Sequence, residues 1–157
     1  MTDTRIAHRS AILHCIADPA KVGVEQCYEY YDDGVMIVAD GHIQALGPAS
    51  DILANYPDVQ VKEHHNKLIV PGFIDTHIHY PQSSVVASYG EQLLDWLENY
   101  TFPAEAKFAD PDHCAETADF FINELLRNGT TTALVFGTVH KTSVEAFFER
   151  ADKQHLR

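Results

Sequence analysis

Short apolar runs separated by turn residues make up the first 65 positions of the chain. Four of these runs mix or alternate apolar and polar residues and predict half-buried β-strands over residues 6–16, 35–39, 43–46 and 59–63. Asp40-Gly41 separates the second and third runs and is a strong signal for a two-residue hairpin turn. So few strands cannot close a barrel, and a lone hairpin is marginally stable in water. We therefore expect this segment to pack on something further.

From residue 68 the pattern changes to apolar strands that alternate with helices. Two buried strands are predicted, from Leu68 to Ile74 across Pro71-Gly72 and from Thr130 to Gly137, because both runs are short, apolar and rich in β-branched residues. The order strand, helix, strand, helix predicts right-handed βαβ units and a parallel sheet. Two parallel strands cannot form a sheet that is covered on both faces. The pattern is therefore typical of the front part of a larger α/β fold.

The segment after the first apolar strand predicts a helix over residues 91–100. Its leucines occur at spacings that suit one apolar face, and Trp96 is expected to pack in the core. Pro103 is expected to end the helical pattern, because proline lacks a backbone N–H and clashes with the preceding turn.

The clearest helix is predicted to have Asp110 as its N-cap and to end before Gly129. Its expected buried stripe consists of Phe120, Phe121, Leu125 and Leu126. Thr142 and Glu145 predict a capping box that opens a last helix over residues 143–153.

A polar cluster follows directly on the first apolar strand and carries His77 and His79. Side chains alternate across a strand, so these two imidazoles leave the same face, about 7 Å apart along the backbone. Neutral imidazoles that converge from one face suit zinc or a similar divalent ion. The alternative is a pair of surface polar residues that cap a core strand. The neighbouring Asp75, Thr76 and Gln82 favour a binding site.

Two other features of this region have more than one interpretation. Asp75 and Thr76 either hold the two histidines or form only turn hydrogen bonds, and the sequence leaves both open. His64 and His65 precede the strand on the side away from its polar end and are expected to be solvated.

Composition narrows the possible partners. The 23 acidic and 11 basic residues give a net charge of −12, which argues against nucleic acid and anionic membrane surfaces as partners. Cys15, Cys27 and Cys114 are odd in number and widely spaced, which indicates free thiols in a reducing compartment. With no evident signal peptide and no apolar run long enough to span a bilayer, a cytoplasmic location is expected.

Several blocks of the sequence resemble the amidohydrolase superfamily, and within it the guanine deaminases. The superfamily pattern PG-[FL]-[IV]-D-x-H-x-H is present at residues 71–79, and the glutamine three positions later, Gln82, is a narrower feature of guanine deaminases. Three further blocks resemble the same enzymes: LDWLENYTFPAE at 94–105, RNGTTTA at 127–133 and GTVH at 137–140. The resemblance is strong from about residue 65 to 145. The first 60 residues resemble the small β-sandwich domain that precedes such barrels only in their general pattern of short strands.

The resemblance implies the start of a metal-dependent TIM (β/α)8 barrel preceded by part of a small β-sandwich domain, an α/β fold that is incomplete as given. It places the sandwich part at residues 1–66 and the first two β/α units at 67–157. It implies one zinc ion per active site, with His77 and His79 as the first two ligands. Gln82 corresponds to the residue that hydrogen-bonds the purine base, and an amide offers both a donor and an acceptor to guanine. His140, at the end of the second strand, is a weaker candidate for the substrate pocket.

The implied reaction is zinc-dependent hydrolytic deamination of guanine to xanthine and ammonia, a step of purine catabolism, in an enzyme expected to be a homodimer when full length. The remaining zinc ligands and the proton-shuttling carboxylate of such enzymes lie on later strands, so no catalytic residue is assigned here and this chain alone is expected to be inactive. Two alternatives stay open. One is another amidohydrolase that acts on a different heterocycle, such as a chlorohydrolase or a cytosine deaminase. The other is a catalytically incomplete remnant or a binding module.

Overall fold

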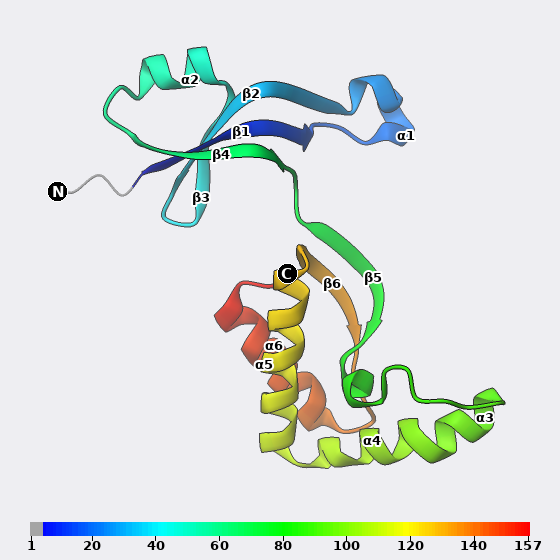
Figure 1. Ribbon diagram of the computed structural model, residues 1–157. Helices are drawn as coiled ribbons and strands as arrows, with labels where there is room; N and C mark the ends of the chain where they lie inside the picture. Colours follow the sequence, from blue (N-terminus) through cyan, green and yellow to red (C-terminus); the bar gives the residue numbers. More distant parts are fainter. Residues whose placement is uncertain (1–4) are drawn as a thin grey trace. The chain divides into compact units, whose positions relative to one another are not determined.

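The computed structural model describes residues 5–157 and divides into two compact units, Met1–Pro71 and Gly72–Arg157 (Figure 1). The division lies a few residues beyond the boundary expected at residue 66. The reason is that the last strand of the first unit continues to Ile69. The two units are described separately.

The first unit contains one four-stranded sheet in the order β3-β2-β1-β4. Its strands are β1 (Ile6–Cys15), β2 (Tyr28–Ala39), β3 (His42–Pro48) and β4 (Gln60–Ile69). Its helices are α1 (Pro19–Val22), a 3-10 turn (Val24–Gln26) and α2 (Ala49–Asn55). The β1–β2 and β2–β3 pairs are antiparallel, whereas β4 runs parallel to β1.

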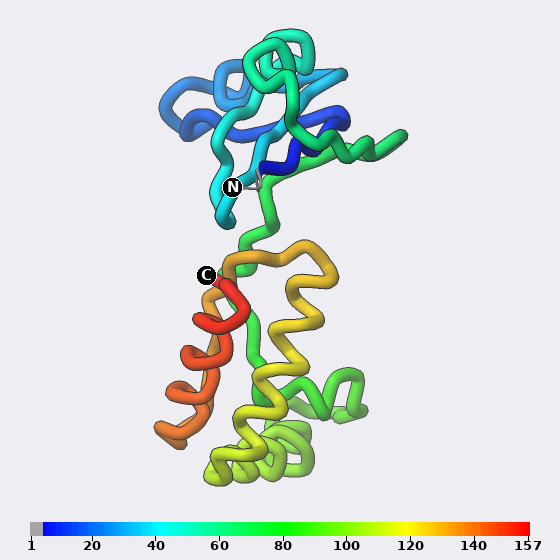
Figure 2. The backbone as a smooth tube through the Cα atoms, turned by 90° about the vertical axis from the view of Figure 1, so that its left-hand side faces the viewer, coloured from blue at the N-terminus to red at the C-terminus, as the bar shows by residue number. Residues whose placement is uncertain are grey.

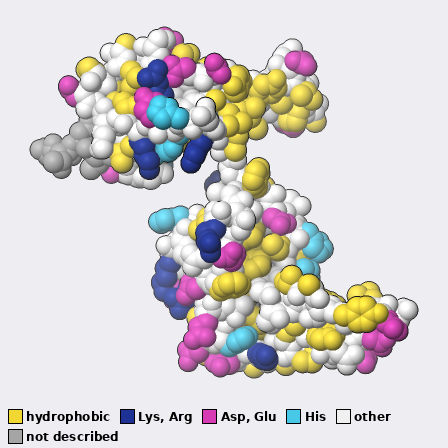
Figure 3. All heavy atoms as spheres, viewed as in Figure 1, with side chains coloured by type: hydrophobic (Ala, Val, Ile, Leu, Met, Phe, Trp, Pro, Cys, Tyr) yellow, Lys and Arg dark blue, Asp and Glu magenta, His cyan; other side chains and the backbone are white. Residues whose placement is uncertain are grey.

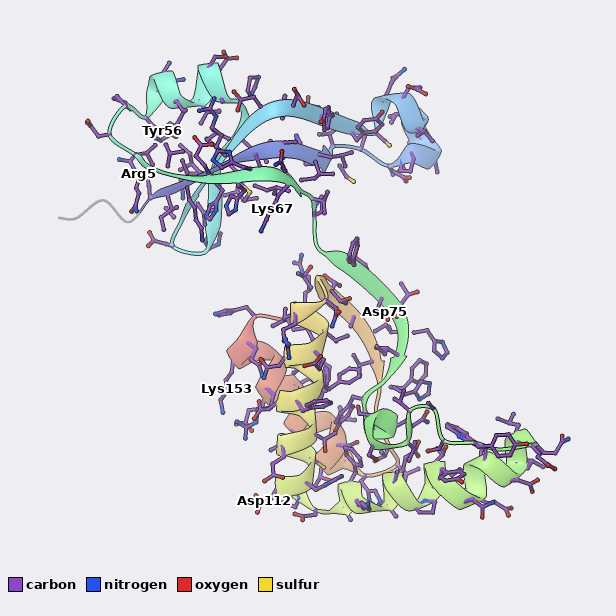
Figure 4. The ribbon with its side chains drawn as sticks, in the orientation of Figure 1. Arg5, Tyr56, Lys67, Asp75, Asp112 and Lys153 are labelled. Atoms are coloured by element: carbon purple, nitrogen blue, oxygen red, sulfur yellow. The ribbon has the colours of Figure 1, made fainter. Side chains whose placement is uncertain are left out.

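The predicted hairpin between β2 and β3 is confirmed. Asp40 and Gly41 both have positive φ, 50° and 75°, which is the backbone that a type I′ turn requires. The small core of this unit gathers Ala7, Val35, Ile37 and Ala49, with side chains of α2 packed against them. The α2 helix thus supplies packing that a bare hairpin lacks. Arg5 lies over the ring of Tyr56, 5.4 Å from its centroid (Figure 4).

Two expectations for the end of this unit were wrong. Leu68 and Ile69 belong to β4, where they pair with Ala11 and Ile12 of β1, and not to the strand that carries the histidine pair. His65 is exposed as expected, but His64 is half-buried: its ring stacks on His8 at 5.3 Å between centroids, and Nδ1 of His8 lies 3.0 Å from Nε2 of His64. Both results follow from the pairing of β4 with β1, which holds Leu68 and Ile69 in this sheet and brings His64 next to His8.

The second unit contains a two-stranded parallel sheet, β5 (Phe73–His79) and β6 (Thr130–Phe136), with helices beside it. Between the strands lie a 3-10 segment (Tyr80–Val85), α3 (Leu93–Trp96), a π-helix (Leu97–Thr101), α4 (Phe102–Ala106), a 3-10 turn (Lys107–Ala109) and α5 (Pro111–Arg127). The last helix is α6 (Lys141–Gln154). Figure 2 shows α5 and α6 side by side.

The core of the second unit forms where α5 and α6 meet the strand ends. Tyr80 is almost fully buried and packs edge-on against Phe108 at 5.1 Å and against Phe147 at 4.8 Å. Its hydroxyl donates to the carbonyl oxygen of Ser143 at 2.5 Å. Burial raises the pKa of the Tyr80 phenol, so this hydroxyl keeps its proton and remains a donor.

The strand order and the parallel pairing were predicted correctly, but the burial of the strands was not. The exposed fraction of the side chain is 61% for Phe73 and 61% for Leu134. A sheet of two strands is covered by α5 and α6 on only part of its surface, and the described residues supply no further strand to it. The Pro71-Gly72 step is tight, because a Cβ added to Gly72 would lie 2.0 Å from Oγ1 of Thr131.

Pro103 does not end the helical segment. The backbone passes from α3 through the π-helix into α4, and Pro103 lies in the first turn of α4, where proline is tolerated. The leucines predicted as a buried face are exposed at Leu93 and Leu94. Trp96 is half-buried and donates its ring N–H to the carbonyl oxygen of Ser88.

Asp110 caps α5 as predicted, since its carboxylate accepts from the backbone N–H of Asp112. The buried stripe is Cys114, Ala118, Ile122 and Leu125. The predicted stripe was therefore wrong at Phe120, which is exposed, and right at Leu125, with Phe121 and Leu126 partly packed against the core. Small residues were overlooked because sequence periodicity was judged from the large ones.

The capping box predicted at Thr142 and Glu145 was also wrong. The α6 helix begins earlier, with His140 at its N-cap. The Thr142 hydroxyl donates to the carbonyl oxygen of Phe108 at 2.6 Å, and Glu145 pairs with Lys141 at 2.5 Å. The hydroxyl of Ser143 instead makes the hydrogen bonds at the start of the helix. It accepts from the backbone N–H of Thr138 and donates to the carbonyl oxygen of His140.

Across residues 5–157, no helix has the length and apolar character needed to cross a bilayer. Cys15, Cys27 and Cys114 are free thiols.

Candidate functional site

The two histidines of the candidate site lie at the carboxyl end of β5. His77 and His79 are two residues apart on the strand and leave the same face, as expected. Their Nε2 atoms are 3.3 Å apart and their ring centroids 5.3 Å apart. The structure therefore brings the ligating nitrogens of both side chains to one point, much closer than the strand spacing requires.

Phe136, the last residue of β6, supports both imidazoles. Its ring stacks on His79 with the planes at 10° and the centroids 4.6 Å apart. It also contacts His77 at 4.8 Å. The parallel register places Phe136 opposite His79, which explains the contact. Sequence reasoning did not single out this phenylalanine, because only the pairing of β5 with β6 shows that it adjoins the histidines.

Asp75, labelled on β5 in Figure 4, makes a local hydrogen bond. Its Oδ1 accepts from the backbone N–H of His77 at 2.9 Å. Within the described part of the chain neither Asp75 nor Thr76 hydrogen-bonds an imidazole of the pair. Of the two interpretations left open for these residues, the geometry matches turn hydrogen bonding.

Gln82 lies next to the histidine pair in the 3-10 segment that follows β5. Its Nε2 is 3.4 Å from Nδ1 of His79 and donates to Oε1 of Glu105 at 3.1 Å. Glu105 belongs to α4 and was not identified as a site residue from the sequence. The block in which it occurs was noted only for its resemblance, and no periodicity connects it to Gln82.

His140 is not brought into this group. It serves as the N-cap position of α6, and its backbone N–H donates to the hydroxyl of Thr138. Among residues 5–157 its side chain makes no hydrogen bond or ring contact with His77, His79 or Gln82.

The nitrogen geometry fits two of the ligands of a zinc ion. Two nitrogens that each bind zinc at about 2.0–2.1 Å in a tetrahedral arrangement are roughly 3.3–3.4 Å apart. The Nε2 atoms of His77 and His79 have this separation. The donor set is partial, because no cluster of three or more His, Cys, Asp or Glu side chains that could hold a metal occurs among the described residues. A catalytic zinc needs about three protein ligands, so this chain supplies part of such a site.

The chain is similar in sequence and in structure to guanine deaminases. The guanine deaminase of Escherichia coli (strain K12) is 47% identical over 135 residues, which covers 85% of this chain and 31% of that protein. The crystal structure of guanine deaminase from Bradyrhizobium japonicum matches with a TM-score of 0.87 and 39% identity over 98% of this chain and 34% of that one. The crystal structure of guanine deaminase from C. acetobutylicum with guanine bound in the active site matches with a TM-score of 0.73 and 28% identity over 97% of this chain and 34% of that one.

The chain thus spans about a third of the length of these relatives. The structural matches confirm the expected fold class, the opening part of an α/β amidohydrolase barrel together with the small β domain before it. The model of the amidohydrolase family matches residues 68–157, more than half of the chain. On this evidence the chain belongs to the amidohydrolase family.

Proposed function

We propose that the protein to which this chain belongs is a zinc-dependent guanine deaminase that converts guanine to xanthine and ammonia. The observation that carries the proposal is the convergence of the Nε2 atoms of His77 and His79 at 3.3 Å, with the amide of Gln82 beside them. Similarity to guanine deaminases, one of them solved with guanine bound, supports the choice of substrate.

The residues of this chain would hold the metal and orient the base. His77 and His79 would bind zinc through Nε2, with Phe136 fixing the planes of both rings. Bound zinc acidifies water and so makes hydroxide available at neutral pH. Gln82 would hydrogen-bond the edge of the purine and so hold its C2 carbon near the metal. His140 is a weaker proposal for the same pocket, since nothing in the described residues ties it to the other three.

The domain assignment and the setting of the enzyme belong to the same proposal. The segment expected at residues 1–66, which the structure extends to the end of β4 at Ile69, would be part of a β-sandwich domain, and the four-stranded sheet supports this. The segment after it, expected at residues 67–157, would be the first two β/α units of the barrel, and the parallel β5–β6 pair supports this. The scattered free cysteines support a cytoplasmic location. Homodimeric assembly stays a prediction, and light scattering on the full-length protein tests it.

Turnover of guanine by the full-length protein tests the function. Formation of xanthine is followed by ultraviolet absorbance, ammonia is measured in parallel, and bound zinc is counted by elemental analysis. We expect both products in equal amounts and about one zinc per chain. Folded, zinc-loaded protein that leaves guanine unchanged, or that hydrolyses cytosine or a chlorinated triazine faster than guanine, would contradict the proposal.

A further inference from the structure

One hydrogen bond beside the histidine pair joins two elements that are 23 residues apart in sequence. Gln82 Nε2, in the 3-10 segment after β5, donates to Glu105 Oε1, in α4, at 3.1 Å. Both side chains are partly buried. Within the described residues Glu105 makes no other side-chain hydrogen bond or ion pair, so its carboxylate has Gln82 as its one protein partner.

This bond fixes which end of the Gln82 amide remains free. An ionised carboxylate only accepts hydrogen bonds, so the amide atom that faces Glu105 has to be the nitrogen. The 3.4 Å approach of Gln82 Nε2 to Nδ1 of His79 does not set this orientation. An imidazole that binds a metal through Nε2 carries its proton on Nδ1, so Nδ1 cannot accept from the amide nitrogen, and the shorter bond to the Glu105 carboxylate decides. Gln82 Oε1 is left without a protein donor among residues 5–157. Unlike Thr101 Oγ1 and Arg150 Nε, which also lack a partner there, Gln82 Oε1 is not fully buried. A ligand can therefore reach it.

The direction in which Glu105 points depends on an irregular turn, the π-helix Leu97–Thr101 that precedes α4. The backbone N–H of Phe102 donates to the carbonyl oxygen of Leu97, a five-residue step that inserts one extra residue into the helix. One residue corresponds to a rotation of about 100° in an α-helix, so a regular helix would direct Glu105 to a different side. Single π-turns of this kind occur frequently at functional sites. The turn contains Thr101, which is buried and whose hydroxyl has no partner within residues 5–157, so the turn carries a free-energy cost of its own.

We propose that Glu105 is a positioning residue: by holding Nε2 of Gln82, it presents the amide carbonyl oxygen as a hydrogen-bond acceptor for an N–H group of the purine. This inference rests on the proposed function. It assigns the carbonyl oxygen of Gln82, the end of the amide that does not face Glu105, to an N–H group of the substrate. Glu105 acts through Gln82 and does not contact the reacting atoms.

Steady-state kinetics on the full-length protein test this role. Glu105→Ala is expected to raise the KM for guanine about tenfold, as the loss of one oriented hydrogen bond does, with kcat within about twofold. Zinc content is expected to stay unchanged, because the variant leaves both histidines in place. Glu105→Gln is expected to raise KM less, since its carbonyl can still accept from Gln82.

A matched control and a double-mutant cycle separate positioning from a structural effect. Glu98→Ala removes an exposed glutamate of the neighbouring π-helix that has no partner among the described residues, and it is expected to leave KM unchanged. In a Gln82→Ala background, Glu105→Ala is expected to cause no further rise in KM, because the group that it positions is gone. If Glu105→Ala fails to fold, the same cycle is run with Glu105→Gln.

Each outcome has one meaning. Three results in a protein that turns over guanine would overturn the positioning role and leave the proposed function intact. Glu105→Ala could raise KM equally with and without Gln82, Glu98→Ala could raise KM as much as Glu105→Ala does, or Glu105→Ala could leave KM unchanged. A wild-type protein that does not turn over guanine overturns the proposed function and this inference with it.

Discussion

At the scale of single residues, the histidine pair is held by neighbours of different kinds. Phe136 packs on both rings, Asp75 holds the backbone N–H of His77, and Gln82 approaches Nδ1 of His79. Ring packing restricts the rotation of an imidazole without occupying its nitrogens. The ligating Nε2 atoms are therefore pre-oriented while they remain available for a metal.

The separate roles of the histidines and Gln82 predict separate losses. In the full-length protein, His77→Ala or His79→Ala is expected to abolish bound zinc, because each change removes one of about three protein ligands and a water molecule in its place binds zinc far more weakly. Gln82→Ala is expected to leave the zinc content unchanged and to weaken guanine binding. Elemental analysis and the KM for guanine measure the two effects. Loss of zinc in Gln82→Ala would show that its assignment is wrong.

Phe136 is predicted to tune metal affinity without touching the metal. Phe136→Leu removes the stacked ring and is expected to weaken zinc binding about tenfold, in the range found for residues that orient ligands. Competition with a chelator measures the affinity. Phe120→Leu, the same change at an exposed position of α5, is the control and is expected to leave zinc affinity unaltered. Equal affinities in wild type and Phe136→Leu would rule out the supporting role.

At the scale of elements, irregular backbone is found beside the candidate site. The π-helix Leu97–Thr101 joins α3 to α4 and precedes Glu105 directly. Pro103 lies just after it, where its missing N–H costs little. In the first unit, the side chains of His8 on β1 and His64 on β4 stack across the two paired strands.

The buried hydroxyl of Thr101 predicts a stabilising substitution. The Thr101 side chain is 2% exposed and its Oγ1 has no partner among the described residues. Thr101→Val keeps the shape and removes the unpaired polar group, so the free energy of unfolding is expected to rise by about 1 kcal/mol. Urea denaturation of the full-length protein and its variants measures this free energy. Thr101→Ser keeps the hydroxyl but loses the methyl group and is expected to be destabilising, and the opposite ranking would count against the argument.

The stacked histidines predict a pH dependence of stability. Burial lowers the pKa of His8, and the neighbouring charges of His64 and Lys62 lower it further. The folded protein then binds fewer protons than the unfolded chain between that lowered pKa and 6.5, so stability is gained as pH rises through this window and lost as pH falls. Urea denaturation of the full-length protein at pH values from about 7.5 down to about 5 should show a shallower loss of stability in His8→Gln than in wild type.

The control for this prediction is His42→Gln. His42 is an exposed residue of the hairpin, and within the described part of the chain its side chain bonds only its own turn, through Nδ1 and the carbonyl oxygen of Asp40. Its replacement should leave the wild-type pH profile in place. A profile that is equally steep in wild type and His8→Gln would remove His8 from the explanation.

At the scale of the whole molecule, the chain leaves much apolar surface in contact with solvent. Phe73, Ile74 and Leu134 on the parallel sheet are between 61% and 69% exposed. Figure 3 shows further hydrophobic side chains on the projecting segment that carries α3, where Leu93 and Leu94 are about 70% exposed. Both edges of the β5–β6 pair lack a further strand among the described residues.

This surface predicts the behaviour of the 157-residue chain expressed alone. Exposed apolar faces and open strand edges promote association, so we expect aggregation and no cooperative thermal unfolding. With an incomplete set of zinc ligands it should also show no turnover of guanine. Light scattering, a thermal melt and the xanthine assay test the three expectations. Robust turnover by this chain alone would contradict the account of the missing ligands.

The sequence by itself determined the order of elements, the hairpin at Asp40-Gly41, the cap at Asp110 and the shared face of His77 and His79. These features depend on near neighbours in the chain, through turn geometry, capping hydrogen bonds and the two-residue alternation of a strand. Local chemistry fixes them before any tertiary contact forms.

Only the tertiary structure decided which strand Leu68 joins, that Phe136 supports the imidazoles and that Glu105 holds Gln82. It also moved the buried stripe of α5 onto small residues and replaced the expected break at Pro103 with a π-turn. The strand pairing, the support by Phe136, the Glu105 bond and the buried stripe all depend on contacts between residues distant in sequence. Periodicity along one segment carries no information about the surface that the segment packs on.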